Sequence, residues 1–176
     1  MKRLIYTFNL FYLFSLALWV AGMFLLGILV EIIVRVTLKD QPEAGSLVMN
    51  RIMDAFNVQI IYTCIGLILA AELIKFLVGK YSKVNIDTTA VTKRRYTKEV
   101  MLAIMIVLAI YMGSVMRPQM HALDQLKKAN PHDEKLEIQF KSFHANFTMI
   151  YSVNMILGLC VFYIHGKQMT RFREHE

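Results

Sequence analysis

Hydrophobic and polar positions divide the chain into four long uncharged stretches. No Asp, Glu, Lys or Arg occurs within residues 4–30, 55–71, 100–116 or 142–166. An α-helix rises about 1.5 Å per residue, so roughly 20 apolar residues cross the hydrocarbon core of a bilayer. The two middle stretches reach this length because the stems of flanking lysines and arginines extend to the interface. The pattern predicts four transmembrane helices, at about residues 4–36, 48–79, 97–121 and 136–166.

The composition agrees with this pattern. Hydrophobic residues make up 56% and charged residues 19% of the 176 residues, against about 45–50% and about 25% in soluble domains. A chain of this length buries one core, so a further division is not expected. We therefore expect an all-α protein, an integral membrane antiparallel four-helix bundle in which residues 1–176 form a single transmembrane domain.

The connections between the helices are predicted to be short. Pro42 and Gly45 interrupt the chain after the first helix, a basic segment over residues 80–96 follows the second, and Asn130-Pro131 predicts a turn after the third. Pro118 is expected to weaken or end the third helix, because proline has no N–H and its ring clashes with the preceding turn. No connection is long enough to form a separate soluble domain.

The charge distribution predicts the topology. The net charge is +7, but no nucleic-acid-binding motif accompanies it, so we expect the lipid bilayer rather than nucleic acid as the partner. The side holding both termini and the basic segment carries twelve basic and five acidic residues, and the other side carries eight of each. Basic residues collect on the cytoplasmic side of short loops. Both termini are therefore predicted to be cytoplasmic, in a plasma or inner membrane.

Ionisable and polar residues gather toward the predicted outer ends of the helices. Such groups are unfavourable in a bilayer and usually face the interior of a bundle, where they pair or line a cavity. An interfacial belt of internal salt bridges is the commoner explanation. The alternative is an outer-leaflet pocket for a small ion, a metal or a lipid headgroup. The candidate pocket residues are Trp19, Asp54, Arg117, His144 and Asn154.

Helical spacing places several of these polar residues on defined faces. A single stripe on the second helix contains Asp54, Asn57, Ile61, Cys64, Ile68 and Glu72. Asn154 falls near the middle of the fourth helix, where an unpaired amide is unfavourable. We expect it to form a hydrogen bond between helices, with contact to a ligand as the alternative.

No cofactor is predicted, although two metal chemistries are conceivable. Five of the twelve methionines form a stripe on the third helix, which is typical of core packing. Thioether and imidazole groups also suit copper, and the weak candidate ligands are Met116, His144 and Met149. A haem would need two facing axial ligands, and His144 with Met116 is the one plausible pair. Catalytic motifs are absent from the sequence, so we do not expect an enzyme.

A set of short motifs resembles a known family. A tryptophan and a glycine occur in the segment Leu18-Trp19-Val20-Ala21-Gly22-Met23-Phe24, Arg117 closes the third helix, and the fourth begins with Phe140-Lys141-Ser142-Phe143-His144 and later carries Asn154. This set is similar to the pattern of the small multi-pass family typified by transmembrane protein 205, over most of the chain. The resemblance implies four spans and an association with tolerance of metal-containing drugs or with membrane trafficking.

Two functions follow from these observations. The first is a non-enzymatic multi-pass membrane protein whose outer-leaflet pocket binds a small polar or ionic ligand. The second is an accessory subunit that packs against a larger membrane protein complex, or a homo-oligomer. For the second function, aromatic residues on the first helix would form the contact surface: Phe8, Phe11, Tyr12 and Phe14.

Overall fold

The computed structural model describes residues 2–81 and 89–174 as four long helical rods, and no strand occurs among these residues. Each of the first three rods contains a π-helical segment between two α-helices. The first rod consists of α1 (Lys2–Phe24), η1 (Leu25–Val30) and α2 (Glu31–Thr37). The second consists of α3 (Pro42–Ala55), η2 (Phe56–Ile61) and α4 (Tyr62–Tyr81). The third consists of α5 (Thr89–Tyr111), η3 (Met112–Met116) and α6 (Arg117–Ala129), and the fourth is α7 (Glu134–Glu174) alone.

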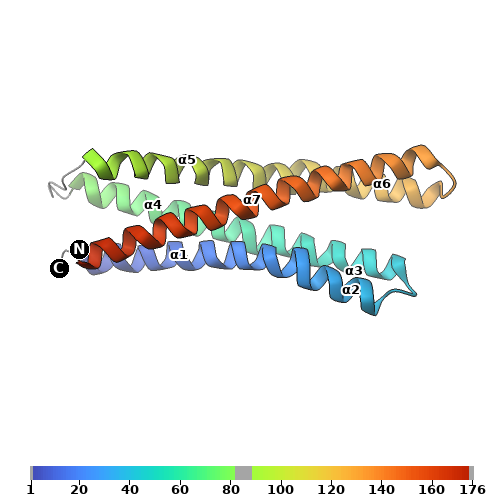
Figure 1. Cartoon of the computed structure of the whole chain (residues 1–176), viewed down its shortest axis with the longest axis horizontal. Helices are drawn as coiled ribbons and strands as arrows, with labels where there is room; N and C mark the ends of the chain where they lie inside the picture. The colour runs from blue at the N-terminus through green and yellow to red at the C-terminus, as the bar shows by residue number, and fades with distance from the viewer. Residues whose placement is uncertain (1, 82–88, 175–176) are drawn as a thin grey trace.

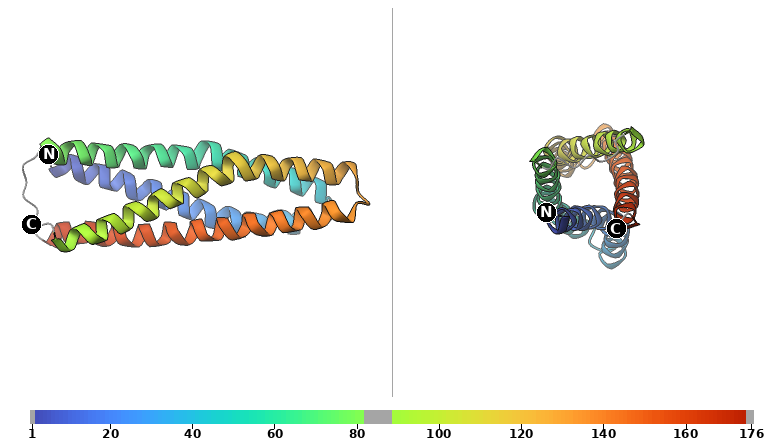
Figure 2. Two further views of the ribbon diagram at one scale, coloured as in Figure 1. Left: turned by 90° about the horizontal axis from the view of Figure 1, so that it is seen from above. Right: turned by 90° about the vertical axis from the view of Figure 1, so that its left-hand side faces the viewer.

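The rods run antiparallel and form one bundle (Figure 1). Both termini lie at one end, here called the terminal end, and the connections after α2 and α6 lie at the other, here called the loop end. Seen along its axis, the bundle has its four rods around a common centre (Figure 2). Helix α1 packs along α4 and α7, and α7 also packs along α5 and α6. This confirms the predicted all-α four-helix bundle.

Four helical stretches are long and apolar enough to cross a membrane, judged by their length and composition: Tyr6–Thr37, Glu43–Leu77, Tyr96–Ala129 and Glu134–Lys167. Many large apolar side chains point outward from them, as expected for surfaces that face lipid. Three exposed tyrosines lie in the parts of α1, α5 and α7 that are close to the terminal end: Tyr6, Tyr96 and Tyr163. Tyrosine is enriched at membrane–water interfaces, so this end is where we place one bilayer surface.

The connections are shorter than predicted. The second rod begins at Pro42 rather than at residue 48, because proline is favoured in the first turn of a helix, where no N–H is needed. The third rod continues to Ala129 rather than stopping at residue 121. Asp133 then caps α7, accepting a hydrogen bond from the Lys135 N–H at 2.9 Å. The basic segment over residues 80–96 is partly helical, and residues 82–88, including Lys83, lie outside the described part of the chain.

Pro118 does not end the third rod, so that alternative was wrong, whereas the rod loses regular α geometry directly before the proline, as the predicted weakening would have it. The proline directly follows η3, and the Arg117 N–H bonds to the Met112 carbonyl five residues earlier. A π-helical segment displaces the carbonyl ladder by one residue. The missing N–H and the ring of Pro118 are therefore accommodated at the transition from π to α geometry, and α6 begins there.

The interior contains one large and one smaller group of buried apolar side chains. The larger group lies toward the terminal end and includes Tyr12, Leu16, Trp19, Ile68 and Met105. The smaller group lies toward the loop end and consists of Met53, Met112, Met116 and Phe147. The methionine stripe of the third rod thus contributes to both groups, which confirms its interpretation as packing material.

Candidate functional site

A cluster of charged side chains crosses the bundle near the terminal end. Glu72 on α4 accepts hydrogen bonds from Lys75 Nζ at 2.7 Å and from Lys98 Nζ, on α5, at 3.0 Å. The two ammonium groups lie 4.9 and 5.0 Å from the centre of the Tyr12 ring on α1. The other neighbour of this ring is His165 on α7, stacked at 4.1 Å. We call these five residues the terminal ionic layer.

The terminal ionic layer joins all four rods, and the sequence analysis did not predict it. The available signal was the spacing on the fourth rod, because His165 lies eleven residues, or about three turns, after Asn154. Both side chains therefore share one face, and both are buried. Lys98 is one of the flanking lysines whose stems are predicted to extend to the interface, whereas its side chain is only 5% exposed and pairs inside the bundle.

A second charged cluster crosses the bundle toward the loop end. Asp54 on α3 lies 2.7 Å from Arg117 Nη2 and 3.4 Å from His121 Nε2, both on α6. Arg117 Nη2 also donates to the Asn50 carbonyl at 3.0 Å. We call Asn50, Asp54, Arg117 and His121 the loop-end ionic layer. Arg117 and His121 lie four residues apart on one face of the third rod, because the rod stays helical through Pro118.

The two ionic layers are separated by about the thickness of a bilayer core. Eighteen residues separate Asp54 from Glu72, and nineteen separate Lys98 from Arg117, which correspond to about 27 and 28 Å of helix. The hydrocarbon core is about 30 Å thick. The layers therefore close the uncharged zone of the bundle at its two ends.

In each layer the basic side chain is the buried partner. The Lys98 side chain is 5% exposed and the Glu72 side chain 22% exposed. The difference is larger at the loop end, where the Arg117 side chain is 4% exposed and the Asp54 side chain 49%. Carboxylates that contact solvent are screened more than the cations they neutralise. The electrostatic potential in the interior between the layers is consequently more positive than the net charge of either pair suggests.

Three buried residues bring polar atoms into the uncharged zone. Asn154 is fully buried, and within the described chain neither its Oδ1 nor its Nδ2 has a hydrogen-bond partner. The same holds for Trp19 Nε1 and Ser15 Oγ. In protein interiors such groups are almost always satisfied, by protein, by water or by a ligand. The predicted hydrogen bond between Asn154 and another helix is therefore not formed by the described residues.

The three π-helical segments lie at one level of the bundle. Counted from Tyr12, Glu72 and Lys98 in the terminal ionic layer, their centres are about 14–16 residues away, or about 20–24 Å. Two tyrosines bridge rods around this level. Tyr151 donates to the Met23 carbonyl at 2.6 Å, and Tyr62 pairs with Ser114 Oγ at 3.3 Å. π-Helical segments often occur at functional sites, and here they lie between Asn154 and the loop-end ionic layer.

The predicted five-residue pocket is not formed at one level. Asp54 and Arg117 are paired, but Trp19 and Asn154 lie deeper, Asn154 being about 16 Å along α7 from His165. His144 is exposed and stacks on Phe140 with ring centres 6.2 Å apart. The prediction combined residues at different depths, and it placed His144 on the inner face although that residue is turned about 80° from Asn154 around α7. The buried members define an interior axis instead.

The weak metal candidates do not converge. Met116 is buried in the smaller apolar group, whereas His144 and Met149 are both exposed. The same separation applies to His144 and Met116 as a haem pair. The inner stripe of the second rod is confirmed, since Asn57, Ile61, Cys64 and Ile68 are buried between its two charged ends.

The structure is thus a bundle with buried polar side chains in its interior and a layer of ion pairs at each end. Comparisons of the chain with protein-family models, with curated proteins and with solved structures found no match.

Proposed function

We propose that this chain is a non-enzymatic multi-pass membrane protein that binds a small polar or ionic species inside the bundle. The binding region lies between the two ionic layers, along the axis of Ser15, Trp19 and Asn154. This replaces the outer-leaflet pocket with an interior one. The transmembrane protein 205-like resemblance is compatible with such a role and stays an expectation.

The observation that carries this proposal is the environment of Asn154. Its side chain is fully buried, and both amide atoms have no hydrogen-bond partner in the described protein. Leaving a buried donor or acceptor unpaired destabilises a protein by about 1–3 kcal/mol per group. At a buried position that serves only for packing, leucine would be more stable than asparagine, because leucine has no polar atoms that need a partner. A bound polar or ionic species that accepts a hydrogen bond from Nδ2 explains why an amide is present.

The proposed orientation has both termini in the cytoplasm. The excess of basic residues lies on the terminal side, and the exposed tyrosines near the terminal ionic layer mark the same interface. The bound species would then reach the interior of the bundle from the cytoplasm or from the opposite side of a plasma or inner membrane.

Replacing the amide tests the proposal. We expect the melting temperature of the purified protein in a non-ionic detergent to rise with at least one member of a panel of salts and small polar solutes. In Asn154→Leu this response should disappear, while the protein without solute melts at or above the wild-type temperature. Asn146→Leu is the matched control, because it removes the same amide from an exposed position on α7. A wild-type protein that responds to no solute, or an Asn154→Leu variant that responds normally, would contradict binding.

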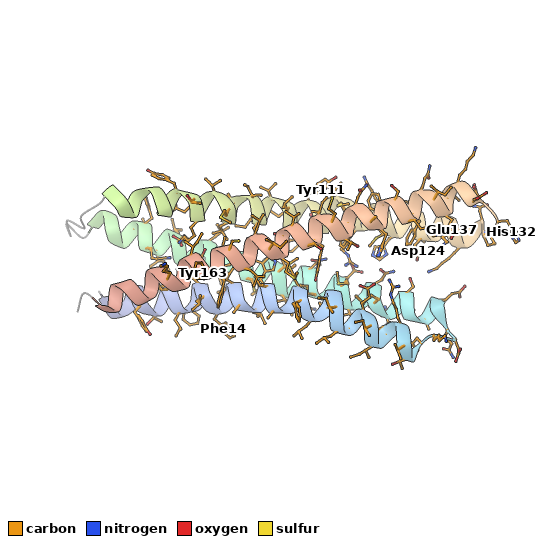
Figure 3. All side chains as sticks on the ribbon, in the orientation of Figure 1. Phe14, Tyr111, Asp124, His132, Glu137 and Tyr163 are labelled. Carbon is orange, nitrogen blue, oxygen red and sulfur yellow. The ribbon has the colours of Figure 1, made fainter. Side chains whose placement is uncertain are left out.

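The accessory-subunit function is supported by a different surface. Phe11 and Phe14 are exposed on α1, and Phe14 points away from the bundle (Figure 3). Phe8 is half-buried and Tyr12 buried, so only half of the predicted aromatic surface faces outward. Outward aromatics also suit lipid. Purification from the native membrane in a gentle detergent, followed by mass spectrometry, distinguishes a stoichiometric larger complex, lost in Phe11→Ala/Phe14→Ala, from a free bundle.

A further inference from the structure

We propose that the interior selects a small monovalent inorganic anion, such as a halide, and that Arg117 provides its charged binding group at the loop end. This inference rests on the proposed function and narrows its ligand to one chemical class. Three independent features of the interior support it: the position of the charges, the unpartnered donors of Arg117, and the donors along the axis.

The charges favour an anion because the cations are the inward members of both ionic layers. Lys98 and Arg117 are nearly fully buried, whereas Glu72 and Asp54 contact solvent. A cation moving along the axis would meet a buried positive group at each end of the uncharged zone. Rings of arginine and lysine favour anions in pores for the same reason.

Arg117 keeps hydrogen-bonding capacity that the protein does not use. Its Nη2 group pairs with the Asp54 carboxylate and donates a hydrogen bond to the Asn50 carbonyl. Its Nε and Nη1 atoms are buried, and no described residue accepts a hydrogen bond from them. A guanidinium has five N–H donors in a fixed fork and no acceptor. Its remaining donors therefore require acceptors, and hydrogen bonds between an ionised donor and an anion are the strongest kind.

The neutral groups along the axis are also mainly donors. Trp19 Nε1 only donates, and Asn154 Nδ2 offers two further N–H groups. The hydroxyls of Ser15 and Tyr12 can turn to donate. Buried apolar side chains, Leu16, Met23, Ile68 and Met105, pack in this part of the bundle. These donors lie at different depths, so a small anion meets them one after another along the bundle rather than all at once, whereas a large polyatomic anion would have to displace the core.

The buried tryptophan makes the test possible with the unmodified protein. Trp19 is the single tryptophan of the chain and is fully buried. Iodide and bromide quench indole fluorescence on contact, as does the cation caesium. We expect sodium iodide and sodium bromide to quench Trp19 with a saturable dependence on concentration, and chloride to compete. Caesium gluconate at equal ionic strength should leave the fluorescence unchanged.

The Arg117→Lys variant locates the charged group. It keeps the positive charge and removes the Nε and Nη1 donors, so the half-saturating iodide concentration for raising the melting temperature should rise at least tenfold; melting is the readout here because Trp19 lies about 18 Å from Arg117 along the bundle. Arg35→Lys is the matched control, because that arginine is exposed near the same end and pairs with Glu31. If Arg117→Lys does not fold, the wild-type halide and caesium measurements still decide on selectivity.

Each outcome bears on a different part of the proposal. Caesium quenching equal to halide quenching would overturn anion selectivity. An unchanged half-saturating iodide concentration for thermal stabilisation in Arg117→Lys would overturn the role of Arg117. Stabilisation of the protein by a neutral solute or a cation, with no effect of halides, would overturn the anion inference and leave interior binding intact. If neither solutes nor ions affect melting or fluorescence, both the inference and the proposed function are wrong.

Discussion

Glu72→Gln is expected to lower the free energy of unfolding by about 3 kcal/mol, because removing one partner of a buried ion pair leaves the other charge uncompensated. Glu72 accepts hydrogen bonds from both Lys75 and Lys98, which come from two different rods. The amide keeps the size of the side chain and loses the charge, so the loss reports electrostatics rather than packing. Chemical denaturation of the purified protein in detergent micelles, followed by circular dichroism, measures it.

Glu31→Gln is the matched control. Glu31 pairs with Arg35 at 2.5 Å on one helix, and the arginine side chain is 70% exposed. Exposed ion pairs contribute about 0–1 kcal/mol, so this variant should unfold close to the wild type. Equal effects of the two substitutions would contradict the role of Glu72 in joining the second and third rods.

Gly158→Leu is expected to destabilise the bundle by about 3 kcal/mol, at the upper end of what overpacking costs. A Cβ atom at Gly158 would lie 2.5 Å from Val20 Cγ2 and 3.1 Å from Met105 Cε. These atoms belong to α1 and α5, so α7 approaches two rods at this glycine. Any larger side chain must push them apart, at the level just terminal to Asn154. Thermal unfolding in detergent measures the loss.

The same substitution at Gly66 separates packing from helix propensity. A Cβ atom there would meet nothing within 4 Å, and leucine is a better helix former than glycine by about 0.8–1.0 kcal/mol. Gly66→Leu should therefore be neutral or stabilising. If Gly158→Leu is equally well tolerated, α7 does not approach α1 and α5 as closely as the structure has it.

The four rods were predictable from the sequence because lipid-facing helices require long uncharged stretches. The helix ends were not, because Pro42 and Pro118 act according to their surroundings. Pro42 lies in the first turn of α3, where proline favours the start of a helix. Pro118 follows a π-helical segment, which accommodates the proline inside the rod. Rules that consider the proline residue alone do not take into account the backbone carbonyls of the preceding turn, and these decide whether a helix can continue through the proline. The π-helical segments themselves had no recognisable sequence signal.

The candidate site was predictable in part. A belt of internal salt bridges at the outer helix ends was one of the two predicted alternatives, and the structure joins two of the candidate residues, Asp54 and Arg117, at 2.7 Å. His144 was misplaced because a helical stripe is defined only relative to a known inner face. That face is set by Phe147, Asn154 and His165, which are all buried. Depth along each helix, counted from both ionic layers, would have separated Asn154 from the outer residues.

The tight connections Leu38–Gln41 and Asn130–Asp133 have a practical consequence. Beyond the loop-end ionic layer, α3 and α6 each continue for eight more residues, or about 12 Å. The surface of this stretch carries two ion pairs, Lys128–Asp124 and Lys141–Glu137, as expected for a part of the bundle that contacts water (Figure 3). It is therefore a rigid attachment point outside the lipid or detergent. A rigid helical partner fused through the turn at residues 130–133 would inherit the orientation of α6 and α7, giving electron microscopy a marker by which to align images of so small a membrane protein.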